Sequence, residues 1–90
     1  MLRYKIIIKG DVQGVGFRYF AYHEAISYNL TGWVRNCYDN SVEIEAQGNA
    51  QDLEKYMISL SDGNRFAYVE SLSKEKMETI DKEKAFMITY

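Results

Sequence analysis

Apolar and polar residues alternate in five segments of the chain, and this alternation predicts five short strands. The first follows Tyr4, Ile6 and Ile8, which are separated by single residues, as the two-residue period of a half-buried strand requires. Between the second and third strands, Asn40 can take the left-handed backbone of a hairpin turn. The other four predicted strands cover residues 32–37, 42–46, 67–72 and 86–90.

Two further segments show the spacing of amphipathic helices. Apolar residues recur at helical intervals from Phe17 to Tyr28, and Asn29 follows, where a left-handed residue commonly ends a helix. The second helix is predicted to begin after Asn49 as its N-cap and to end at Asp62-Gly63-Asn64. Its apolar stripe consists of Leu53, Tyr56, Met57 and Leu60.

The order of these elements is strand, helix, strand, strand, helix, strand, with one strand added. This is the order of the split βαβ motif, so we expect an α+β ferredoxin-like sandwich in which an antiparallel sheet of four to five strands carries two helices on one face. A charged segment, residues 74–84, is expected to be a solvated connection before the final strand. Ninety residues provide material for one hydrophobic core, so residues 1–90 are predicted to form a single domain. The fold alone does not indicate a function.

Composition and charge exclude several classes of protein. The formal net charge is -2 and the pI about 5.3, which argues against broad nucleic-acid binding but not against one small anion. The single cysteine, Cys37, excludes an intramolecular disulfide, and the early apolar run Ile6–Ile8 is too short for a signal peptide or a membrane span. A reducing cytoplasm is therefore expected. We predict no metal and no cofactor, since no ligand spacing of the zinc kind is present and His23 has the position of an ordinary helix residue.

The glycine-rich loop between the first strand and the first helix is the candidate for chemistry. Gly14 and Gly16 allow successive N–H groups to converge, and the helix start adds unpaired N–H donors and the positive end of the helix dipole. Arg18, at the helix entrance, can donate two parallel hydrogen bonds to the same anion. The loop matches neither a Walker motif nor a dinucleotide fingerprint. Spacing alone also allows a tight turn followed by a solvated arginine.

Two longer motifs resemble the signatures of the acylphosphatase family. One is Gly10-Asp11-Val12-Gln13-Gly14-Val15-Gly16-Phe17-Arg18 followed by Phe20, the other is Gly32-Trp33-Val34-Arg35-Asn36, and Phe86-Met87-Ile88-Thr89-Tyr90 is similar to the family's aromatic-x-Ile-x-Tyr ending. The resemblance implies an enzyme that hydrolyses the carboxyl–phosphate bond of acyl phosphates to a carboxylate and inorganic phosphate. It implies that Arg18 binds the phosphate and that Asn36 orients the attacking water. The implied phosphate cradle is the backbone of Gln13, Gly14, Val15, Gly16, Phe17 and Arg18.

The chain departs from the family pattern at its turns. Tyr28-Asn29 stands where Leu-Gly is usual, Asn40 where glycine follows Asp, and Asn64-Arg65-Phe66 lacks the usual prolines. These departures concern the stability of turns and leave the implied catalytic residues in place. Cys37 is expected on the sheet face opposite to Asn36, as a packing residue with a reduced thiol.

Two other functions share features with this sequence. RNA-recognition domains share the element order, but they need a basic surface and aromatic central strands, and Val42-Glu43-Ile44-Glu45 supplies neither. A non-catalytic module that binds a phosphate ligand on the same fold stays open, although Asn36 would then have no evident role. The sequence does not distinguish acetyl, carbamoyl and glyceroyl phosphates as substrates. A monomer is the simplest expectation.

Overall fold

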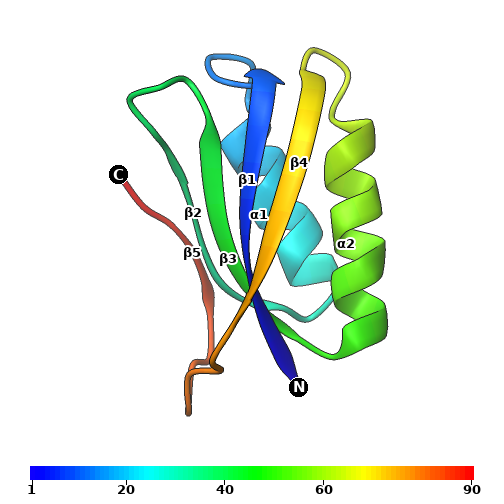
Figure 1. Cartoon of the computed structure of the whole chain (residues 1–90), viewed down its shortest axis with the longest axis vertical. Coiled ribbons are helices and arrows are strands. Elements are labelled where there is room, and N and C mark those ends of the chain that lie inside the picture. Colours follow the sequence, from blue (N-terminus) through cyan, green and yellow to red (C-terminus); the bar gives the residue numbers. More distant parts are fainter.

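Five strands and two helices make up the protein, in a computed structural model that describes residues 1–90 (Figure 1). The element order predicted from the sequence is confirmed. The elements are β1 (Leu2–Asp11), α1 (Phe17–Ser27), β2 (Thr31–Asn36), β3 (Val42–Gly48), α2 (Ala50–Asp62), β4 (Tyr68–Met77) and β5 (Phe86–Ile88).

The strands form one sheet in the order β4-β1-β3-β2-β5. Neighbours among the first four strands pair antiparallel, as expected, whereas β5 pairs parallel with β2, with Phe86 opposite Gly32. The sheet is therefore mixed. The reason is the path of the chain, because β4 ends at the end of the sheet where β2 begins, and residues 78–85 then cross to the far edge, so that β5 runs in the direction of β2 (Figure 1).

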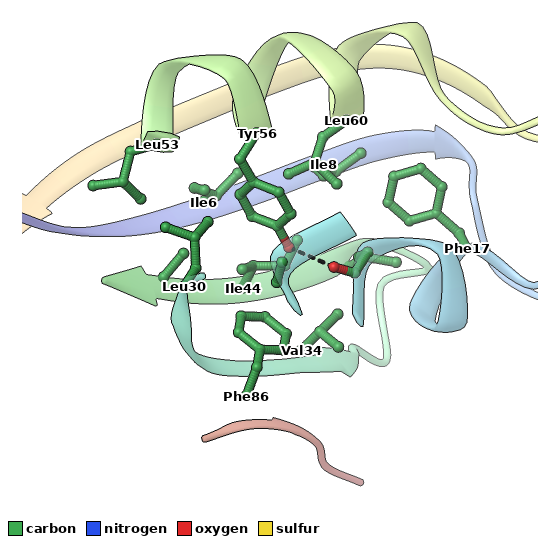
Figure 2. Close-up of a cluster of buried hydrophobic side chains, with 14 of the residues drawn as sticks. Ile6, Ile8, Phe17, Leu30, Val34, Ile44, Leu53, Tyr56, Leu60 and Phe86 are labelled. Carbon is green, nitrogen blue, oxygen red and sulfur yellow. Dashed lines mark hydrogen bonds between the residues drawn. The ribbon is translucent and has the colours of Figure 1, made fainter. Parts of the chain in front are cut away.

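Both helices lie on one face of the sheet, and the core fills the layer between them (Figures 1 and 2). The hydroxyl of Tyr56, from α2, donates a hydrogen bond to the carbonyl of Ala21 in α1 at 3.0 Å, which joins the two helices at the centre of the core. Its burial raises the pKa of Tyr56 far above its usual value. The buried apolar side chains of the sheet that meet the helices are Ile6, Ile8, Val34, Val42, Ile44, Ala46 and Phe86.

The local signals at the ends of elements are confirmed. Asn29 and Asn40 have positive φ values of 59° and 71°, so each supplies the left-handed backbone that was expected of it. The side chain of Asn49 accepts a hydrogen bond from the N–H of Asp52 at 2.8 Å and caps α2. These features depend on residues near one another in the chain, which is why the sequence predicts them.

The charged connection predicted over residues 74–84 begins too early in the sequence, because β4 extends to Met77. Residues 74–77 continue β4, and the connection covers only residues 78–85. Backbone pairing with β1, such as Lys5 opposite Glu75, extends the strand in spite of its low β-propensity. Because β4 is an edge strand, its charged side chains remain solvated while the backbone is paired.

An arginine buried on the helix-free side of the sheet is the feature least expected from the sequence. Arg3 is fully buried, with nitrogens 3.0 Å from a carboxylate oxygen of Glu45 and 2.7 Å from one of Glu83. Beside it, the side-chain amide of Gln47 bonds both the N–H and the carbonyl of Ile80, at 2.8 and 2.9 Å. Arg3 and Gln47 thus hold the connection to β5 against the sheet.

Candidate active site

The glycine-rich loop leads directly from β1 into α1. Gly16 occupies the N-cap with a left-handed backbone (φ 78°) and no side chain caps the helix. The first hydrogen bond inside the helix runs from the N–H of Phe20 to the carbonyl of Gly16 at 3.1 Å. The N–H groups of α1 that come before Phe20 therefore have no partner within the helix. The positive end of the helix dipole adds to the attraction of these N–H groups for an anion.

Arg18 and Asn36 line one cavity of about 490 Å³, at the end of the sheet that also carries the loop. Gln13, the first predicted cradle residue, lines the same cavity. Gly14, Val15, Gly16 and Phe17 do not line it, and Phe17 is a core residue, so only Gln13 and Arg18 of the predicted cradle border this cavity. The structure thus brings the two implied catalytic residues together from α1 and β2. The other lining residues are Arg35, Cys37, Tyr38 and Tyr90.

Arg18 is the one arginine of this cavity without a carboxylate partner. Arg35, the other, has Nε and Nη2 2.7 and 2.6 Å from the same carboxylate oxygen of Glu43. Arg18 forms no ion pair, and its guanidinium carbon lies 5.0 Å from the ring centre of Tyr90. The charge of Arg18 is therefore uncompensated and available to an anionic ligand.

Asn36 ends β2, and its side chain makes no hydrogen bond within the protein. Its Oδ1 is buried without a partner, which costs about 1–3 kcal/mol for a typical neutral group. A side chain that served only to satisfy backbone groups at a strand end would make such bonds. The unpaired amide of Asn36 is instead typical of a side chain retained for a ligand.

His23 lies outside the cavity, whereas Cys37 lines it. His23 is exposed on α1 and packs edge-on against the ring of Tyr22, away from the cavity, as predicted for an ordinary helix residue. Cys37 has a free thiol and lines the cavity beside Asn36, because β2 ends at Asn36 and the strand alternation that predicted the opposite face does not extend to it. No three His, Cys, Asp or Glu side chains lie close enough together to hold a metal ion.

The sequence indicated no separate role for four side chains that line the cavity, those of Gln13, Arg35, Tyr38 and Tyr90. Tyr38 and Tyr90 are exposed at its mouth, and the side chain of Gln13 bonds the β2–β3 turn. Gln13, Arg35 and Tyr90 belong to the motifs described above, but nothing in the local sequence indicated the hydrogen bonds of Gln13 or the position of Tyr38. Neither helix has the length and apolar character needed to span a bilayer.

The sheet order defines the chain as a ferredoxin-like α+β protein, and its candidate anion-binding site lies at the start of the first helix. The family model described as acylphosphatase matches residues 4–88. The chain belongs to the acylphosphatase family.

Similar proteins cover the whole chain. An acylphosphatase from Clostridium acetobutylicum is 50% identical over 90 residues, which are 100% of this chain and 99% of the relative. The crystal structure of acylphosphatase from Bacillus subtilis superposes with a TM-score of 0.96 at 40% identity and covers 100% of both chains. The structure of an acylphosphatase from Coxiella burnetii gives a TM-score of 0.91 at 27% identity, over 98% of this chain and 92% of the other.

Proposed function

We propose that Arg18, the backbone of residues 13–18 and Asn36 carry out the hydrolysis of an acyl phosphate, with the substrate in the cavity lined by Gln13, Arg18 and Asn36 and its phosphoryl group against the neighbouring loop backbone. As a member of the acylphosphatase family, the chain is an enzyme that hydrolyses acyl phosphates to a carboxylate and inorganic phosphate. The observation that carries the assignment of roles is that one cavity contains an arginine without a carboxylate partner and an asparagine without a hydrogen bond.

The phosphoryl group would bind at the start of α1. Its oxygens would accept hydrogen bonds from the unpaired N–H groups of the loop and first turn, and Arg18 would donate two more from its planar guanidinium. Phosphoryl transfer asks a protein chiefly for positioning and for donors around the equatorial oxygens. The loop and Arg18 offer both.

Asn36 would hold the attacking water. The amide cannot take a proton near neutral pH, but it can fix the water oxygen in line with the bond to be broken. The water oxygen then bonds to phosphorus while the bond from phosphorus to the carboxylate oxygen breaks. One water proton passes to a phosphate oxygen, and the electron pair of the broken bond leaves with the carboxylate.

The leaving group explains why no general acid is needed. A carboxylic acid has a pKa of roughly 4, so the carboxylate departs as a stable anion without being protonated. Neither His23 nor Cys37 has a partner that would make an acid–base pair with it. We therefore propose that turnover requires no metal ion and no enzymatic base.

The assay that tests this function uses benzoyl phosphate as substrate after exhaustive chelation of the enzyme. We expect steady-state turnover without added metal, and competitive inhibition by inorganic phosphate and by sulfate, since both are tetrahedral anions. Inhibitor binding without turnover would instead favour the non-catalytic phosphate-binding module. Activity lost on chelation and restored by magnesium or zinc would contradict the metal-free mechanism.

We also propose that the chain acts as a monomer in the cytoplasm, forms one domain over residues 1–90 and binds no nucleic acid. The net charge of -2 supports the last point, because extended phosphate backbones are bound through an excess of Lys and Arg. Sedimentation equilibrium should give a mass of 10.5 kDa for the monomer. A concentration-dependent increase in mass would contradict it.

A further inference from the structure

The two parts of the proposed site belong to strands that are not neighbours. The cradle loop follows β1 and Asn36 ends β2, while β3 lies between these two strands. Adjacent strands are about 4.8 Å apart, so the two parts are separated by roughly twice that distance. Pairing within the sheet therefore does not connect the cradle loop directly to the β2–β3 turn.

The side chain of Gln13 makes this connection. Its Nε2 donates hydrogen bonds to the carbonyls of Cys37 at 2.7 Å and Ser41 at 2.8 Å. These carbonyls lie at the two ends of the turn, which is itself closed by the N–H of Cys37 donating to the carbonyl of Ser41 at 2.9 Å. Gln13 thus bonds both sides of the turn at the point where the chain leaves Asn36.

No other hydrogen bond or ion pair joins residues 12–16 to residues 36–41. The type of side chain suits the contact, because a primary amide offers two N–H donors on one uncharged nitrogen. Both donors of Gln13 are used here, one on each carbonyl. A glutamate at this position would place carboxylate oxygens against two carbonyl oxygens.

We propose that Gln13 is a positioning residue, whose side chain sets the placement of Asn36 relative to the phosphate cradle. This role is distinct from that of the Gln13 backbone in the cradle, and it rests on the proposed function. In-line attack needs the water and the phosphorus in a narrow range of geometry, and a displacement of about 1 Å can lower the rate by about a hundredfold. Gln13 acts through Asn36 and does not itself hold the water.

The test measures kcat, the inhibition constant of inorganic phosphate and the urea midpoint for Gln13→Met, with benzoyl phosphate as substrate. We expect kcat per folded molecule to fall about tenfold to a hundredfold. The phosphate inhibition constant should stay nearly constant, because the loop backbone and Arg18 remain. Gln13→Asn, which is one methylene shorter and cannot reach both carbonyls, should show the same loss of kcat if Gln13→Met does not fold. Gln51→Met, an exposed position on α2, is the matched control and should retain wild-type values.

The double variant Gln13→Met/Asn36→Ala separates positioning from stability. If Gln13 acts through Asn36, the double variant should have nearly the kcat of Asn36→Ala alone. Multiplicative losses in the double variant would overturn the inference, and so would a Gln13→Met enzyme that loses only stability while kcat is unchanged. If the wild-type enzyme shows no turnover, both the proposed function and this inference are contradicted. If the wild-type enzyme turns over and Gln13→Met has the same kcat, only this inference is contradicted.

Discussion

The ring centre of Tyr90 lies 5.0 Å from the guanidinium carbon of Arg18. The contact joins the residues after β5 to the first turn of α1. The N–H of Thr89, the residue before Tyr90, donates a hydrogen bond to the carbonyl of Val34 in β2 at 2.8 Å and so fixes this end of the chain to the sheet. The face of an aromatic ring attracts a cation without neutralising it. We therefore expect Tyr90 to orient Arg18 and to leave its charge for the substrate.

Replacing Tyr90 with Ala should weaken phosphate binding. An exposed cation–π contact contributes about 0.5–1 kcal/mol, so we expect the inhibition constant of inorganic phosphate to rise roughly two- to fivefold. Tyr90→Phe keeps the ring and should stay close to wild type. An unchanged inhibition constant in Tyr90→Ala would mean that the ring does not orient Arg18.

Arg18→Gln should remove most of the turnover and weaken phosphate inhibition. A charge-assisted hydrogen-bonded contact contributes about 1.5–3 kcal/mol to ground-state binding and more as charge develops in the transition state. We therefore expect the inhibition constant to rise by roughly ten- to a hundredfold. Arg65→Gln, an exposed arginine outside the cavity, is the control. Wild-type phosphate affinity in Arg18→Gln would show that another residue binds the anion.

Asn36→Ala should separate chemistry from binding. We expect kcat to fall on the order of a hundredfold while phosphate inhibition is nearly unchanged, because the cradle and Arg18 remain. The urea midpoint should not decrease, since the substitution removes a buried oxygen that has no hydrogen-bond partner. A less stable variant that keeps near-normal turnover would give Asn36 a structural role only.

Arg3→Met should be the most destabilising of these changes. The substitution leaves the carboxylates of Glu45 and Glu83 without their common buried partner, and breaking such a pair costs about 3–5 kcal/mol. Urea denaturation measures the loss, with Lys5→Met as a control because that lysine is partly exposed. Equal free energies of unfolding for the two variants would show that the ion pairs of Arg3 with Glu45 and Glu83 add no more to stability than the partly exposed pair of Lys5.

Glu43 should make stability depend on pH in the acid range. Burial acts to raise the pKa of Glu43, but hydrogen bonds from Arg35 and Lys5 outweigh it, and the pKa lies below its usual value. Because the folded pKa is lower than the unfolded value of about 4.3, the stabilisation is complete above that value and is lost as the pH falls through the folded pKa.

Glu43→Gln should therefore be less stable than wild type at about pH 7, by about 1 kcal/mol for an ion pair whose partners are partly solvated. The difference should shrink as the pH falls below about 4.3 and through the lowered pKa of the folded state, because the wild-type carboxylate then also becomes neutral. Urea midpoints of both proteins across this range test the expectation. A difference that stays constant with pH would assign the effect to packing.

The sequence determined the features that depend on neighbouring residues. The two-residue and 3.6-residue periods gave the element order, and Asn29, Asn40 and Asn49 marked turns and a cap that the structure contains. The motifs around Arg18 and Asn36 indicated the family and the candidate site. The predicted elements, turns and cap agree with the structure because backbone preferences and side-chain periods act within a few residues.

Only the tertiary structure decided how distant segments meet. The parallel pairing of β5 depends on the path of residues 78–85, and the burial of Arg3 depends on Glu83 arriving from another part of the chain. The same holds at the site, where Gln13 bonds a turn that begins 24 residues later and Tyr90 lies on Arg18. A single hydrogen bond or aromatic contact has no period along the sequence, so its partners are defined only when the sheet places them side by side.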